Sequence, residues 1–289
     1  MSVDAARLTA PLDGDQYALL REGVEDDPAI NVYINAQGDF AFLDPMPVTD
    51  YASYETRSEK LGLKGYKHKE AALRARLEKI GSLLPRDGKV LEIGAADGAF
   101  LALAREIAPT SHFASIEPDQ RTRPERDALP WLTQYDDMDH ATVQGGGFDL
   151  VMLFHVFEHV LEPAGFLNAV KGLLADGGAL LIEVPCLHDP LLSLYENPDY
   201  QAFYFQRQHP FVYSAGSLER VLDASGYAVR RRIPLQRYGL ENHLQWLTKG
   251  KPGGNALFRE VFAGSDDAYR AALEAAGTTD TIIVEAVAA

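Results

Sequence analysis

The 289-residue chain is 46% hydrophobic, which is enough to bury the core of one elaborated domain or of one domain with a small appendage. Its 27 basic and 42 acidic side chains give a formal net charge of −15, which repels polyphosphate backbones and argues against a nucleic-acid partner. A single cysteine excludes a disulfide framework, and neither a membrane-length apolar run nor a signal-like N-terminus is seen, so we expect a cytoplasmic protein without a membrane partner.

Residues 1–60 carry a different pattern from residues 61–289, and we divide the chain into these two units. In the first unit, the runs Ile30–Asn35 and Phe40–Leu43 flank Gln37-Gly-Asp, which predicts a β-hairpin. A polar and aromatic segment follows, and it leads into a helix that we expect over residues 67–80.

The stretch from Lys89 to Phe100 predicts a strand, a tight turn and a helix in direct succession. Val90 to Ile93 form the apolar strand, Gly94 and Gly98 bracket the turn, and a helix is expected over residues 99–107. Such a turn lets a nucleotide-like ligand approach the backbone closely. The acids Glu92 and Asp97 flank the turn, so it disfavours phosphate and suits a ligand with an ammonium group and hydroxyls.

Acidic side chains also follow the next two expected strands. Residues 112–117 read as a strand that ends in Glu117, about 20 residues beyond the glycines, which is the spacing at which an acid meets ribose hydroxyls in doubly wound folds. A short strand over residues 131–134 precedes Asp136 and Asp137, one of which could accept a hydrogen bond from an adenine amino group. S-adenosylmethionine matches all of these features.

Strands and helices alternate from residue 89 onward. We expect strands at 148–154, 179–184, 227–233 and 279–286, and helices at 163–174, 217–225 and 266–276. This alternation predicts an α/β fold, a doubly wound and mostly parallel sheet with helices on both faces. Two insertions, 187–214 and 236–265, interrupt the pattern, and long insertions over the ligand-binding edge usually shape specificity.

The strand at 148–154 delivers two imidazoles and a carboxylate to the edge where ligands bind in such sheets. These are His155, Glu158 and His159, which converge if the segment begins a helix. His209 is a fourth candidate. Three interpretations remain open: the four side chains bind a divalent metal, a histidine acts as a metal-free base, or the Glu-His pair only fixes the loop.

The chain resembles class I S-adenosylmethionine-dependent methyltransferases, in the group of ubiquinone-pathway O-methyltransferases and of sugar and natural-product methyltransferases. The resemblance covers roughly residues 60–235 and is carried by 91–98, 115–118, 148–159 and 173–183. It implies a seven-stranded sheet completed by a late antiparallel strand, and a cofactor site at Glu92, Gly94, Ala95, Asp97, Gly98, Glu117, Asp136, Asp137 and Phe154.

Three features of this chain bear on the resemblance. Ala96 stands where the family commonly has Gly, and we expect only a minor change in the turn. Asn35 and Gly38 stand where many relatives carry the Cys-x-x-Cys of a zinc knuckle, so we expect no zinc there. The segment with Tyr51, Tyr54 and Arg57 corresponds to a lid over the cofactor, with ordinary helix packing as the alternative.

Plant small-RNA 2′-O-methyltransferases and ubiquinone-pathway enzymes carry a similar Glu-x-x-Glu-His motif for a divalent metal, and the former add a histidine near the position of His209. This resemblance implies the ligands His155, Glu158, His159 and His209. Because His155 replaces the first Glu, Mn²⁺, Fe²⁺, Co²⁺ or Zn²⁺ suits the set better than Mg²⁺.

The acceptor is expected to be a small molecule. Arg207, Arg237, Asn242 and His243 lie among aromatic side chains in the insertions and suit a sugar or a small phosphorylated acceptor, with a homodimer contact as the alternative. We therefore expect methyl transfer to a hydroxyl of a sugar or secondary metabolite. The alternatives are C-methylation of a keto-sugar and a non-catalytic cofactor-binding module.

Overall fold

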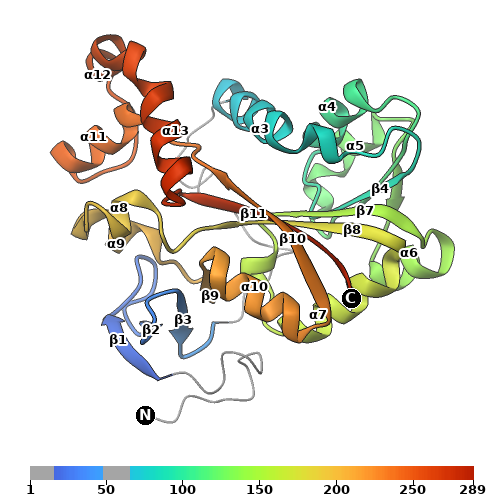
Figure 1. The fold of residues 1–289 in the computed structure, drawn as a ribbon, viewed down its shortest axis with the longest axis horizontal. Coiled ribbons are helices and arrows are strands. Elements are labelled where there is room, and N and C mark those ends of the chain that lie inside the picture. Colours follow the sequence, from blue (N-terminus) through green and yellow to red (C-terminus); the bar gives the residue numbers. More distant parts are fainter. Residues whose placement is uncertain (1–15, 48–65) are drawn as a thin grey trace.

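The computed structural model describes residues 16–47 and 66–289, and its centre is a seven-stranded sheet in the order β10-β11-β8-β7-β4-β5-β6 (Figure 1). Neighbours from β8 to β6 pair in parallel, and β11 runs antiparallel to both β8 and β10. The mostly parallel doubly wound sheet with a late antiparallel strand is thereby confirmed. Its strands are β4 (Lys89–Ile93), β5 (His112–Ile116), β6 (Thr133–Tyr135), β7 (Phe148–Phe154), β8 (Leu174–Pro185), β10 (Tyr227–Leu235) and β11 (Thr281–Ala288).

Helices cover both faces of the sheet because alternate residues of its central strands are apolar on both sides. Leu150 and Met152 of β7 pack with α3 (Tyr66–Ile80) and α4 (Ala99–Ile107) on one face. Val151 and Leu153 face the opposite side, where α6 (Met138–Gln144), α7 (Pro163–Leu173) and α10 (Ala215–Ala224) lie. Figure 1 shows these two helical layers above and below the strands.

The predicted N-terminal hairpin is present and belongs to a second, antiparallel sheet. Strands β2 (Asn31–Asn35) and β3 (Phe40–Asp44) form the hairpin, β1 (Tyr17–Arg21) pairs with β2, and β9 (Phe211–Tyr213) pairs with β3. Neither β1 nor β9 was expected from the sequence. Phe40 and Phe42 are buried in the same apolar cluster as the central strands, so this sheet shares a core with the domain that follows it.

Asn35 organises the turn of the hairpin through its side-chain amide. Its Oδ1 accepts hydrogen bonds from the backbone N–H of Asp39 at 3.0 Å and of Phe40 at 3.1 Å. Asp39 in turn forms a two-pronged ion pair with Arg220 of α10, at 2.6 and 3.0 Å, and the Arg220 hydrogen bond lowers the pKa of this carboxyl. Hydrogen bonds and an ion pair therefore close the turn of this hairpin.

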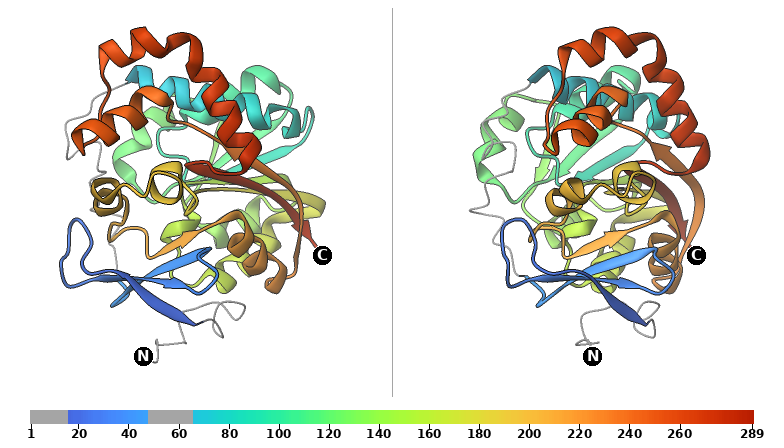
Figure 2. Two further views of the ribbon diagram at one scale, coloured as in Figure 1. Left: turned by 60° about the vertical axis from the view of Figure 1, so that its left-hand side comes forward. Right: turned by 90° about the vertical axis from the view of Figure 1, so that its left-hand side faces the viewer.

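The first insertion packs into an aromatic-rich cluster that it shares with the N-terminal sheet and with the second insertion. It contains α8 (Pro190–Ser193), α9 (Pro198–Tyr204) and β9, and its buried Tyr200, Tyr204 and Phe205 pack with Trp246 of the second insertion. The second insertion contains α11 (Leu240–Lys249) and α12 (Ala256–Phe262), followed by α13 (Asp266–Ala276). Figure 2 shows the N-terminal sheet, α8–α9 and α11–α13 stacked at one end of the central sheet.

A short helix, α5 (Arg123–Asp127), lies in the connection between β5 and β6. The segment with Tyr51, Tyr54 and Arg57, which we expected to be a lid or an ordinary packing element, lies outside the described residues. Among the residues that are described, no helix is both long and apolar enough to cross a membrane.

Candidate cofactor and acceptor site

The turn after β4 requires glycine at both predicted positions. Gly94 and Gly98 adopt φ values of 80° and 77°, in the left-handed region. A Cβ at Gly94 would lie 2.3 Å from Cγ2 of Val156, so the loop that follows β7 packs directly on this turn. The close contact joins the expected cofactor cradle to the segment that carries His155, Glu158 and His159.

Ala96, at the centre of the same turn, also adopts a left-handed conformation, with φ of 47°. An L-residue with a Cβ is strained there, whereas Gly is not. The turn is nevertheless held on both sides: the Ala96 N–H donates to Glu117 and the Ala96 carbonyl accepts from the buried guanidinium of Arg126. Ala96 therefore adopts the left-handed backbone conformation that a Gly would adopt at this position.

Glu117 points toward the glycine turn, as the cofactor interpretation requires. Its Oε2 accepts the Ala96 N–H at 2.8 Å and its Oε1 accepts the Asp119 N–H at 2.7 Å. An ionised carboxylate offers about four lone-pair positions, so each oxygen can accept a further hydrogen bond from a ribose hydroxyl.

Glu92 is a buried acid beneath the turn and is only 4% exposed. Its Oε2 has no hydrogen-bond partner among the described residues. Burial raises the pKa of Glu92 to about 8, Arg76 opposes this, and Asp97 and Glu117 add to it. An ammonium group at this position would satisfy the orphaned oxygen and favour the ionised form, so the cradle fits the cationic end of S-adenosylmethionine.

The two acids expected near adenine have local partners in the structure. Oδ1 of Asp137 accepts the His140 N–H at 2.7 Å and caps α6, which is the ordinary role of Asp before a helix. The Asp136 side chain is 74% exposed and lies 3.4 Å from Nδ1 of His140. Both residues are exposed, and Asp137 is the one engaged at a helix N-terminus.

The remaining expected cofactor residues, Ala95, Asp97 and Phe154, form hydrogen bonds within the turn or pack next to it. The Ala95 carbonyl accepts the Gly98 N–H at 2.8 Å, and Asp97 Oδ1 accepts the Ala99 N–H at 3.2 Å. Phe154, only 7% exposed, lies under the guanidinium of Arg76 with 4.4 Å between the Arg76 Cζ and its ring centroid. Phe154 thus packs between the sheet and α3.

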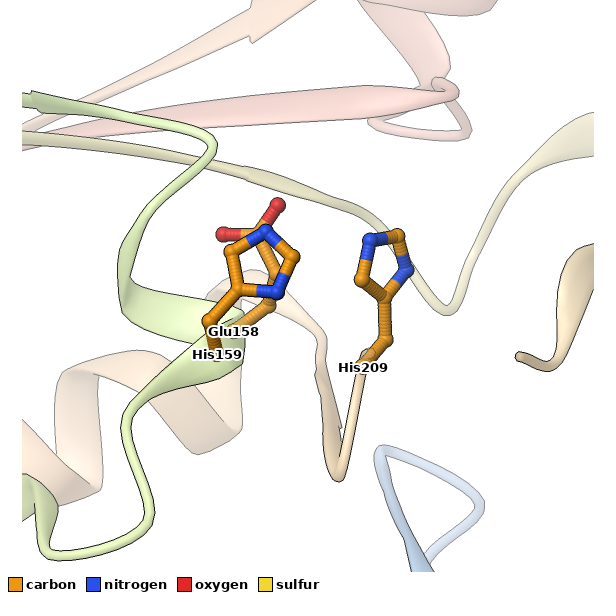
Figure 3. Close-up of side chains that lie close together, drawn as sticks. All are labelled: Glu158, His159 and His209. Atoms are coloured by element: carbon orange, nitrogen blue, oxygen red, sulfur yellow. The ribbon is translucent and has the colours of Figure 1, made fainter. Parts of the chain in front are cut away.

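Glu158, His159 and His209 come together beside this cradle (Figure 3). Each offers a ligand atom, and these atoms all lie within 4.8 Å of one another. Glu158 and His159 project from the single 3₁₀ turn Phe157–His159, and His209 comes from the loop before β9. The structure therefore brings together three of the four side chains expected to bind a metal.

Glu158 is the buried member of the group, at 2% exposure, and its Oε2 has no hydrogen-bond partner in the described part of the chain. Burial by itself raises its pKa, but the hydrogen bond with His155 and the charge of His159 prevail and lower the pKa to about 2. Glu158 is thus an ionised carboxylate at neutral pH with one oxygen left for a cation or a hydroxyl.

His159 is oriented by the backbone. Its Nδ1 lies 2.5 Å from the carbonyl oxygen of Gln208 and must donate to it, which leaves the lone pair on Nε2. The rings of His159 and His209 lie 5.0 Å apart at their centroids. A fixed tautomer with an acceptor Nε2 is what both a metal ligand and a general base need.

His155 does not join this group, and the expected convergence through a helix does not occur. The chain forms only the 3₁₀ turn, and His155 precedes it in a left-handed conformation with φ of 55°. Its Nδ1 lies 3.2 Å from Glu158 Oε1, and its Nε2 lies 2.9 Å from Glu183 Oε1. Burial and Arg237 lower the pKa of His155, but the two carboxylates outweigh them and the net shift is upward.

Of the four residues expected to contact the acceptor, Arg237 lies next to His155, which itself contacts Glu158. Its Nη1 lies 2.8 Å from His155 Nε2, and its Nε donates to Asp280 at 3.2 Å. Arg207 lies at the surface, 44% exposed, with its Nε 3.8 Å from Asp27 in the N-terminal sheet unit. Asn242 donates to the Gly253 carbonyl in its own insertion.

His243 is a packing residue between α11 and α13. It is 1% exposed, its Nδ1 lies 2.6 Å from the Tyr269 hydroxyl, and burial lowers its pKa to about 4. The Tyr269 hydroxyl lies 2.8 Å from that of Tyr195. His243 therefore ties the second insertion to the first rather than facing an acceptor.

Sequence reasoning missed three charged residues that hold the site: Arg76, Glu183 and Asp280. Glu183 is 0% exposed, and it interrupts the apolar run Leu180-Leu-Ile-Glu-Val of β8. An acid within a strand that is buried on both faces needs a cationic partner, and that pattern could have identified it.

A sequence model described as a methyltransferase domain matches residues 66–231. Similar solved structures include a chain from a complex that contains the Haloferax volcanii Trm112 methyltransferase activator, with 14% identity, 82% of this chain and 99% of that chain covered, and a TM-score of 0.55. An S-adenosylmethionine-dependent methyltransferase from Archaeoglobus fulgidus gives 19% identity, 76% and 94% coverage, and a TM-score of 0.50.

The plantazolicin methyltransferase BpumL, in complex with a pentazolic desmethylPZN analog and SAH, gives 12% identity, 80% and 89% coverage, and a TM-score of 0.50. No curated protein sequence matches the chain. The matched domain covers more than half of the chain and contains the glycine turn, Glu117 and the His155–His159 segment. The chain therefore belongs to the methyltransferase-domain family and is a class I S-adenosylmethionine-dependent methyltransferase.

Proposed function

We propose that the protein transfers the methyl group of S-adenosylmethionine to a hydroxyl of a small polar acceptor that binds at Glu158, His159 and His209. The observation that carries this proposal is the buried Glu158, which has an unpartnered Oε2 and offers a carboxylate oxygen within 4.8 Å of ligand atoms on two imidazoles. The group begins two residues after Val156, which packs on the glycine turn. A nucleophile held there is adjacent to the cofactor cradle.

Methyl transfer from a sulfonium requires an oxygen nucleophile aligned with the methyl carbon, and it requires removal of the hydroxyl proton. Alignment at short distance supplies most of the rate in such reactions. His159 can receive the proton at Nε2, because its Nδ1 already donates to the Gln208 carbonyl. Glu158, ionised and buried beside His159, stabilises the imidazolium that forms.

As the alternative to a metal-free base, the same three side chains fit a divalent first-row metal, and Nε2 of His159 would then be a ligand and not the proton acceptor. Two imidazoles and a carboxylate are ligands for Mn²⁺, Fe²⁺, Co²⁺ or Zn²⁺ rather than for Mg²⁺, and an orphaned carboxylate oxygen is a ready ligand atom. When bound, such an ion would lower the pKa of an acceptor hydroxyl. Glu158, His159 and His209 would hold it, and the Gln208 carbonyl would orient the His159 ring.

The acceptor we favour is a sugar or a secondary metabolite with neighbouring hydroxyls. Arg237 lies against His155, and its guanidinium carbon lies 5.5 Å from the ring centroid of Tyr238, which is 47% exposed, so a polar group and an aromatic ring lie together next to His155. Polar groups beside rings are typical of sites for small polar ligands.

The proposal is tested by measuring S-adenosylhomocysteine release with a panel of vicinal diols, mono-alcohols and keto-sugars, before and after EDTA and after addition of Mn²⁺. We expect turnover with a hydroxyl acceptor that the His159→Ala variant loses, while His112→Ala, far from the cluster at the exposed start of β5, keeps it. EDTA-insensitive methylation of a keto-sugar carbon supports C-methylation instead. Tight cofactor binding without turnover on any acceptor supports a non-catalytic module.

A further inference from the structure

His155 stands between two buried carboxylates and uses both ring nitrogens. Nδ1 lies 3.2 Å from Oε1 of Glu158, and Nε2 lies 2.9 Å from Oε1 of Glu183 and 2.8 Å from Nη1 of Arg237. Nε2 is therefore occupied, whether it donates a hydrogen bond to Glu183 or accepts one from Arg237. His155 therefore has no nitrogen directed toward an acceptor in this arrangement.

The backbone at His155 indicates that this placement is specific. His155 is one of three non-glycine residues with positive φ in the described part of the chain, at 55°. A side chain in the left-handed region is strained, and such strain persists where the surroundings over-determine it. Here the surroundings are the Glu158 and Glu183 carboxylates and a backbone hydrogen bond from the His155 N–H to the Glu183 carbonyl at 2.9 Å.

The second carboxylate is itself fixed from the opposite side. Glu183 receives two hydrogen bonds from Arg76 of α3, at 2.5 and 2.7 Å, and its side chain is 0% exposed. A continuous series of contacts thus runs from Arg76 of α3 through Glu183 and His155 to Glu158. Helix α3 lies on the same face of the sheet as α4. Only Glu158, the last member of the series, lies in the proposed acceptor site.

We propose that His155 is a positioning residue: it holds Oε1 of Glu158 and so fixes the carboxylate beside His159 and His209 with Oε2 left unpartnered, and it is anchored through Glu183 to Arg76. This inference rests on the proposed function, because it takes Glu158 as an acceptor-site residue. It assigns His155 neither proton transfer nor contact with the acceptor. The residue acts on the reaction only through the orientation of Glu158.

Two amide substitutions separate the two sides of the imidazole. The amide of Asn places a donor near the position of Nδ1, whereas the longer Gln reaches the position of Nε2. Asn also tolerates positive φ better than other non-glycine residues. His155→Asn therefore keeps the hydrogen bond to Glu158. His155→Gln keeps the hydrogen bond to Glu183 but loses the hydrogen bond to Glu158, on which this proposal depends.

The experiment compares His155→Asn, His155→Gln and His155→Ala, with His112→Asn as the control. Crystal structures of the variants give the position of Glu158, and steady-state kinetics give kcat and KM on the acceptor found above. We expect Gln and Ala to displace the Glu158 carboxylate and to lower kcat by about 10- to 100-fold with little change in KM. Asn should keep both the carboxylate position and most of kcat.

Three results overturn the inference: Gln as active as wild type while Asn is not, all three variants equally inactive with Glu158 unmoved, or all three fully active. The first result would show that Nε2, and not Nδ1, is the nitrogen on which activity depends. The second would show that the imidazole itself is needed, independently of the position of Glu158. The proposed function is judged separately through Glu158→Gln. If that variant retains full methyl transfer, the acceptor site is not at Glu158, whereas the carboxylate positions in the His155 variants still decide the positioning role.

Discussion

Arg76 of α3 and Glu183 of β8 form a buried two-pronged ion pair although 107 residues separate them in the chain. Both hydrogen bonds are short, at 2.5 and 2.7 Å, and the guanidinium also stacks over Phe154. Burial alone would raise the pKa of Glu183, but Arg76 and His155 hold it far below its usual range. The pair fixes the first described helix of the domain onto the strand that supports the acceptor site.

Breaking this pair should strongly destabilise the fold. Arg76→Met keeps the apolar stem but leaves Glu183 charged and buried, which typically costs about 3–5 kcal/mol. Urea unfolding followed by circular dichroism measures the loss. Arg74→Met is the matched control, because Arg74 lies on the same helix and pairs with Glu70 at the surface, where a change of less than about 0.5 kcal/mol is expected. Equal losses in the two variants would contradict a stabilising role for the buried pair.

Glu92 should make the stability of the protein fall as the pH rises. Its pKa is about 8 in the folded chain against 4.5 for an unperturbed Glu, so between these values the folded state holds a proton that the unfolded chain has released. The free energy of unfolding therefore decreases with pH in this window, at a slope of up to ~1.4 kcal/mol per pH unit from this group.

Glu92→Gln removes that contribution, because the amide does not titrate. The difference in unfolding free energy between the variant and wild type should shift in favour of the variant as the pH rises from 4.5 to 8. Taking the difference cancels other groups such as Asp189, whose pKa burial also raises, to about 7. A pH-independent difference would show that Glu92 is ionised in the free protein.

Ala96→Gly should be neutral or stabilising, unlike most Ala→Gly changes. An L-residue in the left-handed region costs about 1–2 kcal/mol, while Gly costs about 0.5–1 kcal/mol in chain entropy. Thermal or urea unfolding gives the change. Ala102→Gly, in the middle of α4, is the control and should lose about 0.5–1 kcal/mol. If both variants lose the same amount, the positive φ at Ala96 carries no strain.

His159→Ala and His209→Ala should lose methyl transfer by more than ~10²-fold while S-adenosylhomocysteine binds as it does to wild type. The expectation follows from the position of both imidazoles at the Glu158 carboxylate, beyond the glycine turn. Calorimetry measures the inhibitor affinity and a turnover assay measures the rate. Unchanged turnover in both variants would remove the two histidines from the reaction.

Much of the fold follows from local patterns. The strand, turn and helix from Lys89 to Ile107 could be predicted because a buried apolar run meets glycines whose φ only Gly adopts easily. The pairing of β3 with β9 could not, since β9 is three residues long and its partner lies far away in the chain. Short capped helices such as α6 were also missed, because Asp137 reads equally well as a ligand contact or as an N-cap.

The candidate site was predictable in its composition and less so in its geometry. Glu158 and His159 could be proposed from the motif and from the edge of the sheet where it lies, and His209 from the resemblance to metal-dependent methyltransferases. The direction of His155 could not, because it depends on a left-handed backbone and on Glu183 in a neighbouring strand. Glu183 can be recognised as an acid within an apolar strand, but no spacing in the sequence identifies Arg76, 107 residues away, as its partner.

A crystal structure with S-adenosylhomocysteine and Mn²⁺ tests the central claim most directly. The account predicts ribose hydroxyls on Glu117 and the sulfur directed toward His159. An anomalous manganese peak between Glu158, His159 and His209 would select the metal-bound form of the site, and its absence would select the metal-free base. A nucleoside that avoids Glu117, or a sulfur that faces away from these three side chains, would contradict the account.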